Sequence, residues 1–425
     1  MNVAPEIKGW CPGALRPMAS GDGLLVRAKA VGSALPAAAA REIADIASAC
    51  GNGLIDLSQR AQLQLRGVTE RMLGEALTRL HALAMLAPDA ATESVLNVLS
   101  SPLAGLDARA SFDGNALARE LADAIMGDAG LRALPGKFLF LIDDGSALGL
   151  ADVEADIRLE ARENGVAVIA AGAGDRAVVL ARENAIDAAL NIARAFVALR
   201  EGRAFELRRM RLLVGALGIA ALEREAKLEM RAVVAPGRAA RQEASFGAQA
   251  ADGVFYAGAG APFGRWRADE LAALAHLAAE LGRRELRLTP WRALLVPAPS
   301  LDSARAICAA AKSRGLIVEA SDPRLAVAAC PGAPECPQAL GPTRAHLDRL
   351  APPARALAPD GVTLHVSGCA KGCARPGPTR VTLVTRGERY DLIENGRASD
   401  APSGAALTLE ETERALAAMA ERETR

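Results

Sequence analysis

The chain has 425 residues, and its 50 Lys and Arg residues balance its 50 Asp and Glu residues to a formal net charge of zero. Bulk electrostatics therefore favour neither nucleic acid nor an anionic membrane as a partner. The first residues hold no apolar stretch of signal-peptide length, and no uncharged apolar run reaches the roughly 18 residues of a membrane span. We expect a cytoplasmic protein of two or three domains.

The first elements along the chain form a strand, helix, strand unit. Residues 23–28 (Gly-Leu-Leu-Val-Arg-Ala) are typical of a strand, an Ala-rich helix follows from Leu35, and Gly51 separates this helix from an alternating strand that begins at Leu54. These elements predict a first half-unit, A, over residues 1–86. A Pro-containing break, Ala-Pro-Asp-Ala-Ala, follows it.

The same unit returns in the second half of the chain. A strand is predicted from Gly253, a helix over 269–281, and a further strand after Gly282. An offset of 231 residues superposes Gly282 on Gly51 and keeps the order and register of the elements. We therefore predict a second half-unit, A′, over residues 236–299.

A second, fainter repeat relates the remaining parts, which we name lobe B (87–235) and lobe B′ (300–425). Each lobe is predicted to begin with a helix, continue with several strands and close with a helix. The helices of B are expected at 116–126 and 186–200, and its strands from Lys137 and at 166–170 and 177–180. The helices of B′ are expected at 343–350 and 408–421, the latter opened by a Thr408 and Glu411 capping box, and its strands from Val362 and at 380–385 and 389–393. The predicted fold class is α+β with a pseudo-twofold duplication.

Only lobe B′ carries closely spaced cysteines. Cys330 and Cys336 have five residues between them, and Cys369 and Cys373 have three. A four-iron cluster takes four thiolates, and Pro and Gly beside each pair keep the backbone out of regular structure. Zinc is the alternative, but structural zinc sites usually use shorter spacings. Seven cysteines in all are too few, and odd in number, for a disulfide framework.

With these features, the chain resembles the nitrite and sulfite reductase superfamily over nearly its whole length. Within it, the segments that begin Cys11-Pro-Gly-Ala-Leu-Arg and Cys330-Pro-Gly-Ala-Pro-Glu resemble the cobalamin-biosynthesis branch, the precorrin-3B synthases. The resemblance implies two ferredoxin-like half-units and two larger α/β lobes. It also implies the four cysteines of B′ as ligands of a 4Fe-4S cluster.

The resemblance implies Arg and Lys side chains around the carboxylates of a tetrapyrrole. Arg27, Arg60 and Lys137 match family positions, whereas two other positions at which the reductases carry cations hold Leu96 and Leu139. Half of the clamp for a small anion is thus apolar, which disfavours sulfite reduction. The predicted substrate-binding residues are Arg27, Arg60, Arg66, Lys137, Arg292 and Lys371, with Arg16 and Arg375 as further candidates. Catalytic residues are not predicted.

The reaction that the resemblance implies is an oxygen-dependent hydroxylation of precorrin-3A with lactone formation, which gives precorrin-3B. An all-thiolate cluster offers no open position for O₂, so the resemblance also implies a mononuclear non-haem iron. The sequence does not identify the ligands of this second iron. No NADH or flavin site is visible, and the run Gly258 to Gly264 is interpreted as a turn. Electrons are expected from an external reductase or ferredoxin, and ultimately from NADH.

Two alternatives stay open at this point. A sirohaem-dependent sulfite or nitrite reductase is favoured by the cysteine spacing, and a non-catalytic iron–sulfur carrier or sensor would need far fewer residues. His365, four residues before Cys369, is predicted to lie beside the cluster. Cys373 is interpreted as a fourth cluster ligand, although in sirohaem enzymes the matching cysteine also bridges to the haem iron. Cys11, the thiol nearest the N-terminus, is interpreted as an iron ligand or a free thiol.

Overall fold

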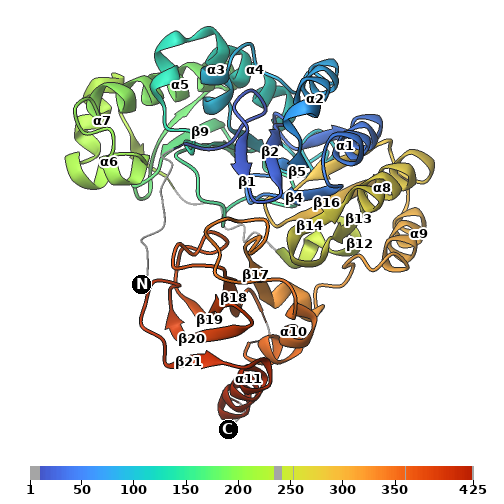
Figure 1. Cartoon of the computed structure of the whole chain (residues 1–425). Coiled ribbons are helices and arrows are strands. Elements are labelled where there is room, and N and C mark those ends of the chain that lie inside the picture. Colours follow the sequence, from blue (N-terminus) through green and yellow to red (C-terminus); the bar gives the residue numbers. More distant parts are fainter. Residues whose placement is uncertain (1–9, 234–241, 252, 359, 424–425) are drawn as a thin grey trace.

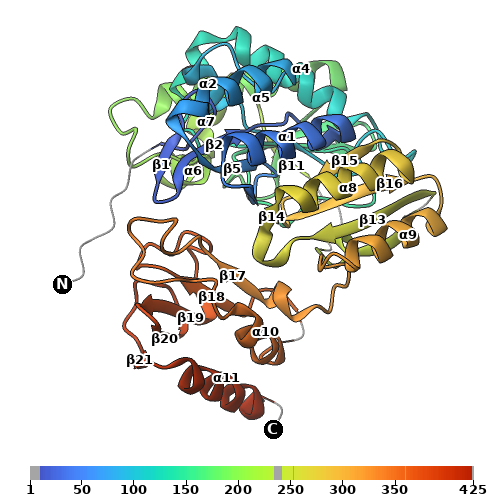
Figure 2. The ribbon, with the colours of Figure 1, turned by 45° about the vertical axis from the view of Figure 1, so that its right-hand side comes forward.

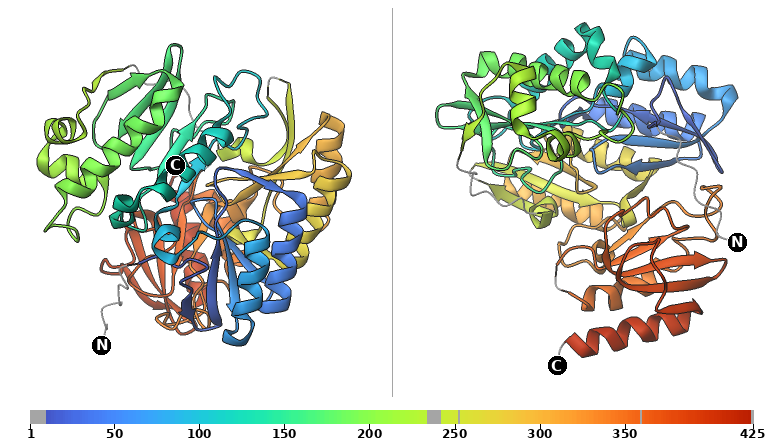
Figure 3. Two further views of the ribbon diagram at one scale, coloured as in Figure 1. Left: turned by 90° about the horizontal axis from the view of Figure 1, so that it is seen from above. Right: turned by 90° about the vertical axis from the view of Figure 1, so that its left-hand side faces the viewer.

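A computed structural model describes residues 10–233, 242–251, 253–358 and 360–423. Four sheets organise the molecule, one for each predicted part of the repeat (Figure 1). The two half-units lie side by side, lobe B lies beside them, and lobe B′ lies at the opposite end (Figures 1 and 3). Helix α11 (Leu409–Glu423) lies at the far side of B′ (Figure 3).

The two half-units exchange one strand each. The first sheet has the order β1 (Met18–Ser20), β2 (Gly23–Ala28), β5 (Leu63–Val68), β4 (Leu54–Leu57) and β14 (Arg265–Arg267). The second has the order β12 (Gly247–Ala251), β13 (Val254–Gly260), β16 (Ala293–Ala298), β15 (Glu285–Leu288) and β3 (Ala34–Pro36). Strand β14 of the second unit thus completes the first sheet, and β3 of the first completes the second. This reciprocal exchange joins A and A′ into one body.

The helices of the half-units cover this body on one side. They are α1 (Ala37–Cys50), α2 (Glu70–Ala82), α8 (Ala268–Glu280) and α9 (Leu301–Lys312). Helices α1 and α8 pack against each other (Figure 2), and one hydrophobic core includes Ile43 of α1, Leu271 of α8 and Trp266 of β14. Helix α9 packs on β12 and β13, so the second half-unit continues past the predicted boundary at residue 299.

Equivalent turns confirm the predicted register of the repeat. In the first half-unit the backbone N–H of Gln62 donates to Ser58 Oγ at 3.1 Å, and in the second the N–H of Ala293 donates to Thr289 Oγ1 at 3.2 Å. Ser58 and Thr289 are the residues that the 231-residue offset superposes, and each supplies the hydroxyl that closes its turn. The two sheets therefore share local turn chemistry as well as strand order.

Lobes B and B′ also have matching sheets. The sheet of B is formed by β6 (Val98–Ser100), β7 (Phe140–Asp143), β8 (Ile157–Arg162), β9 (Gly165–Ala170), β10 (Arg176–Leu180) and β11 (Arg231–Ala232). That of B′ is formed by β17 (Val327–Ala329), β18 (Leu364–Ser367), β19 (Thr379–Arg386), β20 (Arg389–Gly396) and β21 (Gly404–Leu407). In both, the first three strands are parallel and the next two pair antiparallel. The predicted α+β duplication is confirmed.

Helices cover each lobe and give it a core of its own. Those of B are α3 (Ala90–Val95), α4 (Gly114–Gly127), α5 (Arg182–Leu199), α6 (Met210–Leu217) and α7 (Ile219–Ala226), and B′ adds α10 (Leu347–Ala356) to α11. The capping box of α11 forms as predicted: Thr408 N–H donates to Glu411 Oε2 at 2.8 Å, and Glu411 N–H donates to Thr408 Oγ1 at 3.2 Å.

One local prediction, a turn over Gly258 to Gly264, was wrong in its first part. Gly258 and Gly260 lie in strand β13, whereas Pro262–Gly264 form a short 3-10 turn. A Cβ at Gly258 would lie 2.1 Å from the carbonyl oxygen of Ser245, so this glycine permits the close approach of a neighbouring segment to the strand. The glycines mark tight packing, which a sequence pattern does not distinguish from a turn.

Candidate functional site

The two cysteine pairs lie on neighbouring loops of lobe B′. Cys330 directly follows β17 and Cys369 follows β18, and these strands pair in parallel. Because the carboxyl ends of parallel strands meet at one edge of a sheet, both loops leave the sheet at the same place. The topology thus brings together two pairs that lie far apart in the sequence.

The surroundings of these thiols are suited to cysteine sulfurs that act as cluster ligands. The backbone N–H of Gly368 donates to Cys330 Sγ at 3.2 Å, and burial raises the pKa of Cys330. Cys373 has the most exposed side chain of the four, yet desolvation of its sulfur raises its pKa to about 11, and the other three cysteines contribute to this rise because they lie nearby. The four thiols therefore share one small region.

Within residues 10–233, 242–251, 253–358 and 360–423, no three His, Cys, Asp or Glu side chains stand in a metal-binding arrangement. The donor set nevertheless has the chemistry of a cluster site, since two pairs of thiols lie on neighbouring loops and a backbone amide already points at one sulfur. Gly332 and Gly372 hold positive φ angles of 75° and 62° inside the two loops, which favours glycine there. The residues present therefore fit an iron–sulfur cluster.

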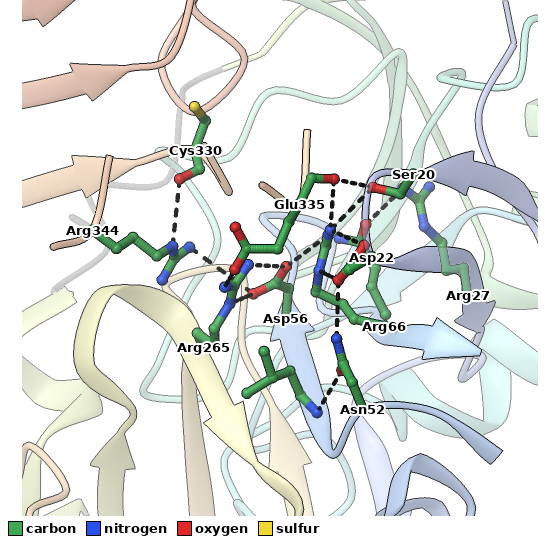
Figure 4. A network of polar contacts seen from close by, with 12 residues as sticks. Ser20, Asp22, Arg27, Asn52, Asp56, Arg66, Arg265, Cys330, Glu335 and Arg344 are labelled. Atoms are coloured by element: carbon green, nitrogen blue, oxygen red, sulfur yellow. Dashed lines mark hydrogen bonds and ion pairs between the residues drawn. The ribbon is translucent and has the colours of Figure 1, made fainter. Parts of the chain in front are cut away.

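An ion-pair network joins the first cysteine loop to both half-units (Figure 4). We use this name for Asp22, Asp56, Arg66, Arg265 and Glu335. Arg66 is 1% exposed and lies 2.9 Å from Asp22 Oδ1 and 3.3 Å from Asp56 Oδ2. Arg265, on the exchanged strand β14, lies 2.9 Å from Asp56 Oδ1 and 2.8 Å from Glu335 Oε1. Each buried charge in this network thus has an opposite charge beside it.

Glu335 connects this network to the loop between Cys330 and Cys336. The backbone N–H of Gly21 donates to the Glu335 carbonyl at 2.9 Å, and Ser20 Oγ donates to the same oxygen. Arg344 lies close to Asp56 and contacts the carbonyl of Cys330 at 3.4 Å (Figure 4). Despite desolvation, the cations around Asp56, above all Arg265, hold the pKa of this carboxyl below its ordinary value. The shape of the cysteine loop therefore depends on residues far away in the sequence.

A second set of cations lies at the junction of A and B and has no carboxylate of the described residues within ion-pair distance. We call Arg27, Lys29 and Arg60 the unpaired cation group. Arg27 is 9% exposed, and its guanidinium donates to Gln64 Oε1 at 3.4 Å and also contacts the Cys11 thiol. The Nε atoms of Arg27 and Arg60 are buried without a partner, and burial lowers the pKa of both guanidinium groups. Cys11, Glu93 and Asp156 lie near these positive charges and offset only part of their desolvation.

Lys29 was not predicted as a site residue. Its Nζ donates to the carbonyl of Glu93 at 2.5 Å and to Asn97 Oδ1 at 3.3 Å, both in lobe B. Burial, followed by the charge of Arg27, lowers its pKa to about 8. Lys29 stands two positions after Arg27, and side chains two apart along a strand share a face, so this spacing could have pointed to it.

The other predicted residues occupy varied places. The guanidinium of Arg66 is already paired with Asp22 and Asp56 in the ion-pair network. Its part in substrate binding stays a prediction. Lys137 and Lys371 are exposed. Arg292 lies in the turn of A′ that is equivalent to the turn of Arg60, with a φ angle of 63°. Arg16 is exposed and lies over the ring of Trp10.

The two positions that lack the expected cations are apolar in the structure as well. Leu139 is 3% exposed within the core of the half-units, and Leu96 packs against the core of lobe B. The backbone N–H of Leu139 donates to Asp156 Oδ2 at 3.0 Å, so the neighbouring carboxylate is engaged by the backbone. Neither position supplies charge for a small anion.

Comparisons with known proteins agree with this architecture. The family model described as "Nitrite/Sulfite reductase ferredoxin-like half domain" matches residues 16–83 and 248–314, the two half-units. The solved structure of the Mycobacterium tuberculosis NirA protein aligns over 93% of this chain and 79% of that one, with a TM-score of 0.71 and 21% sequence identity. A sulfite reductase (ferredoxin) 2 from Mycolicibacterium paratuberculosis is 24% identical, over 88% of this chain and 70% of its own length. The fold and its repeat are those of the nitrite and sulfite reductase class.

A more similar relative narrows the class. A precorrin-3B synthase from a Sinorhizobium species is 33% identical over 413 residues, which cover 95% of this chain and 86% of the relative. The chain belongs to the precorrin-3B synthase family, a branch of oxidoreductases within the nitrite and sulfite reductase superfamily. No helix among the described residues is long and apolar enough to cross a membrane, and a cytoplasmic location stays a prediction.

Proposed function

We propose that the protein converts precorrin-3A to precorrin-3B in cobalamin biosynthesis, by an oxygen-dependent hydroxylation followed by lactone closure. One atom of O₂ enters the product and the other leaves as water, and an external donor, ultimately NADH, supplies two electrons. The observation that carries this proposal is the unpaired cation group. Buried cations that form no ion pair with any described carboxylate suit a ligand that brings its own carboxylates, as a precorrin does.

The residues of this chain have two roles in the proposal. Arg27, Lys29 and Arg60 bind carboxylates of the ring and so orient the macrocycle against lobe B, while Leu139 leaves no charge that would hold sulfite or nitrite instead. Cys330, Cys336, Cys369 and Cys373 would hold a 4Fe-4S cluster. Such a cluster supplies single electrons, and a mononuclear non-haem iron would supply the activation of O₂.

An external electron donor would approach the exposed side of the cysteine loops. Cys373 and Lys371 are exposed there, and the side chain of Leu340 is 49% exposed on the adjoining segment. A partly apolar surface with a cation suits a transient contact with an acidic electron-transfer protein. The donor is proposed to be a reductase or ferredoxin.

The reaction is tested with protein purified without oxygen, reconstituted with iron and sulfide, and then given precorrin-3A, a reductase system and isotopically heavy O₂. We expect a product that has gained one heavy oxygen atom. Unchanged precorrin-3A beside an intact cluster would contradict the proposal. A stoichiometric haem-type Soret band in the purified protein would favour the sirohaem reductase that the cysteine spacing permits.

The cluster ligands are tested separately. We expect Cys336→Ser to lose bound iron and sulfide, together with much of the soluble yield, because a thiolate ligand is removed. The control is Cys308→Ser on α9, outside the cysteine loops, which should keep the iron content of the parent protein. Equal iron in both variants would exclude Cys336 as a ligand.

A further inference from the structure

His365 is a fully buried imidazole without a hydrogen-bond partner. It lies on β18 and is 0% exposed, and neither Nδ1 nor Nε2 has a partner among the described residues. Its ring adjoins the second cysteine loop, since a Cβ placed on Gly372 would lie 3.5 Å from His365 Cε1. His346 shows the usual arrangement in the same lobe, because its Nδ1 lies 3.0 Å from the hydroxyl of Tyr390.

Two cations accompany this imidazole. Arg375 follows the second cysteine loop and Arg292 comes from the turn of A′, and both lie close enough to add to the effect of burial, which lowers the pKa of His365 to about 4. Arg375 Nε is buried without a partner, and burial lowers the pKa of Arg292. Neither guanidinium forms an ion pair with a described residue. An imidazole and a guanidinium with buried atoms that lack partners thus lie together with the cation of Arg292 where A′ meets B′.

Such a cluster destabilises the protein unless something completes it. Buried polar groups are nearly always hydrogen-bonded, and each one left without a partner destabilises the folded protein because its lost contacts with water are not replaced. A neutral imidazole offers one N–H donor, and the two guanidinium groups offer only donors and positive charge. What is missing here is therefore an acceptor with negative charge.

We propose that His365, Arg375 and Arg292 form a binding site for an anionic hydrogen-bond acceptor that the polypeptide itself does not supply. Two groups have this chemistry: a sulfur atom of the proposed cluster in the adjoining loops, and a carboxylate of the proposed tetrapyrrole. The internal repeat relates this site to the unpaired cation group, because Arg292 in A′ and Arg60 in A occupy equivalent turns. The inference rests on the proposed function only for the source of the acceptor.

The variant His365→Leu tests the site, with His346→Leu as the control. Without iron or tetrapyrrole, His365→Leu should keep or raise the unfolding midpoint, because it removes unsatisfied polar atoms. His346→Leu should lower the midpoint, because the hydroxyl of Tyr390 loses its partner. Arg375→Met is the second variant and should resemble His365→Leu in stability.

Two measurements then distinguish the sources. Binding of uroporphyrin, a tetrapyrrole polycarboxylate, should weaken about tenfold in His365→Leu if the acceptor is a carboxylate, since about 1.4 kcal/mol corresponds to tenfold. The midpoint potential of the reconstituted cluster should shift if the acceptor is sulfur, because hydrogen bonds to sulfur tune that potential.

Unchanged uroporphyrin affinity together with an unchanged potential, in both His365→Leu and Arg375→Met, would overturn the site. A lowered unfolding midpoint with both ligand measurements unchanged would also overturn it, since His365 would then have a structural role alone. Failure of the parent protein to bind either iron or uroporphyrin would count against the proposed function instead, and so the two failures are distinguishable.

Discussion

The ion-pair network and the unpaired cation group both bury basic side chains, yet they treat charge in opposite ways. Arg66 is 1% exposed between two carboxylates, whereas Arg27 is 9% exposed and contacts an amide oxygen at 3.4 Å and the Cys11 thiol instead of a carboxylate. Burying a charge costs free energy unless the charge is paired. The ion-pair network offsets this cost with carboxylates of the protein, whereas Arg27 and Arg60 have no ion-pair partner among the described residues. If these two arginines bind the ligand as proposed, the partner of a buried arginine, rather than its burial, separates structural from binding residues.

The largest expected effect tests the network. Asp56→Asn removes the carboxylate shared by Arg66 and Arg265 and leaves each of these buried cations with one carboxylate instead of two, so we expect a loss of about 3–5 kcal/mol in the free energy of unfolding. Denaturant unfolding measures it. Asp302→Asn is the control, because its carboxylate pairs with Arg305 on the exposed surface of α9, and its unfolding midpoint should not move. An Asp56→Asn variant as stable as the parent protein would show that the ion-pair network does not stabilise the fold.

The next effect tests the unpaired cation group and has the opposite sign for stability. Arg27→Met should keep or raise the stability of the ligand-free protein while it weakens uroporphyrin binding by roughly ten- to a hundredfold, since a charge-assisted hydrogen bond contributes about 1.5–3 kcal/mol. Fluorescence titration and thermal unfolding measure the two quantities. If Arg27→Met unfolded as easily as Asp56→Asn, the division between the two groups would fail.

A pH dependence of binding sharpens the comparison further. The folded pKa of Lys29 is lowered to about 8 from an ordinary 10.5, so between these values the unfolded chain holds a proton that the folded chain has lost. The ligand-free protein therefore gains stability as pH rises through this window, because a buried charge has been removed. The same deprotonation should weaken uroporphyrin binding from about pH 7 to about pH 9.

The groups that face Lys29 are Arg27, Arg60, Cys11 and Glu93, so these are the charges that accompany its titration. Lys29→Met is the control for the pH dependence, and its affinity should change much less across the same range. A parent protein whose affinity is flat from about pH 7 to about pH 9 would show that Lys29 does not hold the ligand.

The smallest expected effect concerns Lys137. Because this side chain is exposed, Lys137→Ala should keep the cluster and weaken uroporphyrin binding only about threefold, as solvent screens an exposed charge. Iron content and fluorescence titration provide the two readings. The matched control is Lys312→Ala at the end of α9, whose lysine is exposed and pairs with Glu319. Normal binding by Lys137→Ala would remove it from the site.

Sequence reasoning predicted the parts of this molecule whose signals are local. Helix and strand periodicity gave the order of the elements, and the Thr408 and Glu411 capping box forms as expected. The offset that superposes Ser58 on Thr289 identified two turns with the same hydroxyl hydrogen bond. The reciprocal exchange of β3 and β14 was not predictable, because each is a strand of three residues whose pairing partner lies more than 200 positions away.

The candidate site divides in the same way. The sequence by itself determined the fold class, the repeat and the four candidate thiols, since spacing and periodicity are properties of neighbours along the chain. Only the tertiary structure decided that Arg66 is neutralised by Asp22 and Asp56 while Arg27 and Arg60 are not. The reason is physical: the free energy of a charge depends on its burial and on the charges within a few ångströms, and folding brings those together from all four parts of the chain.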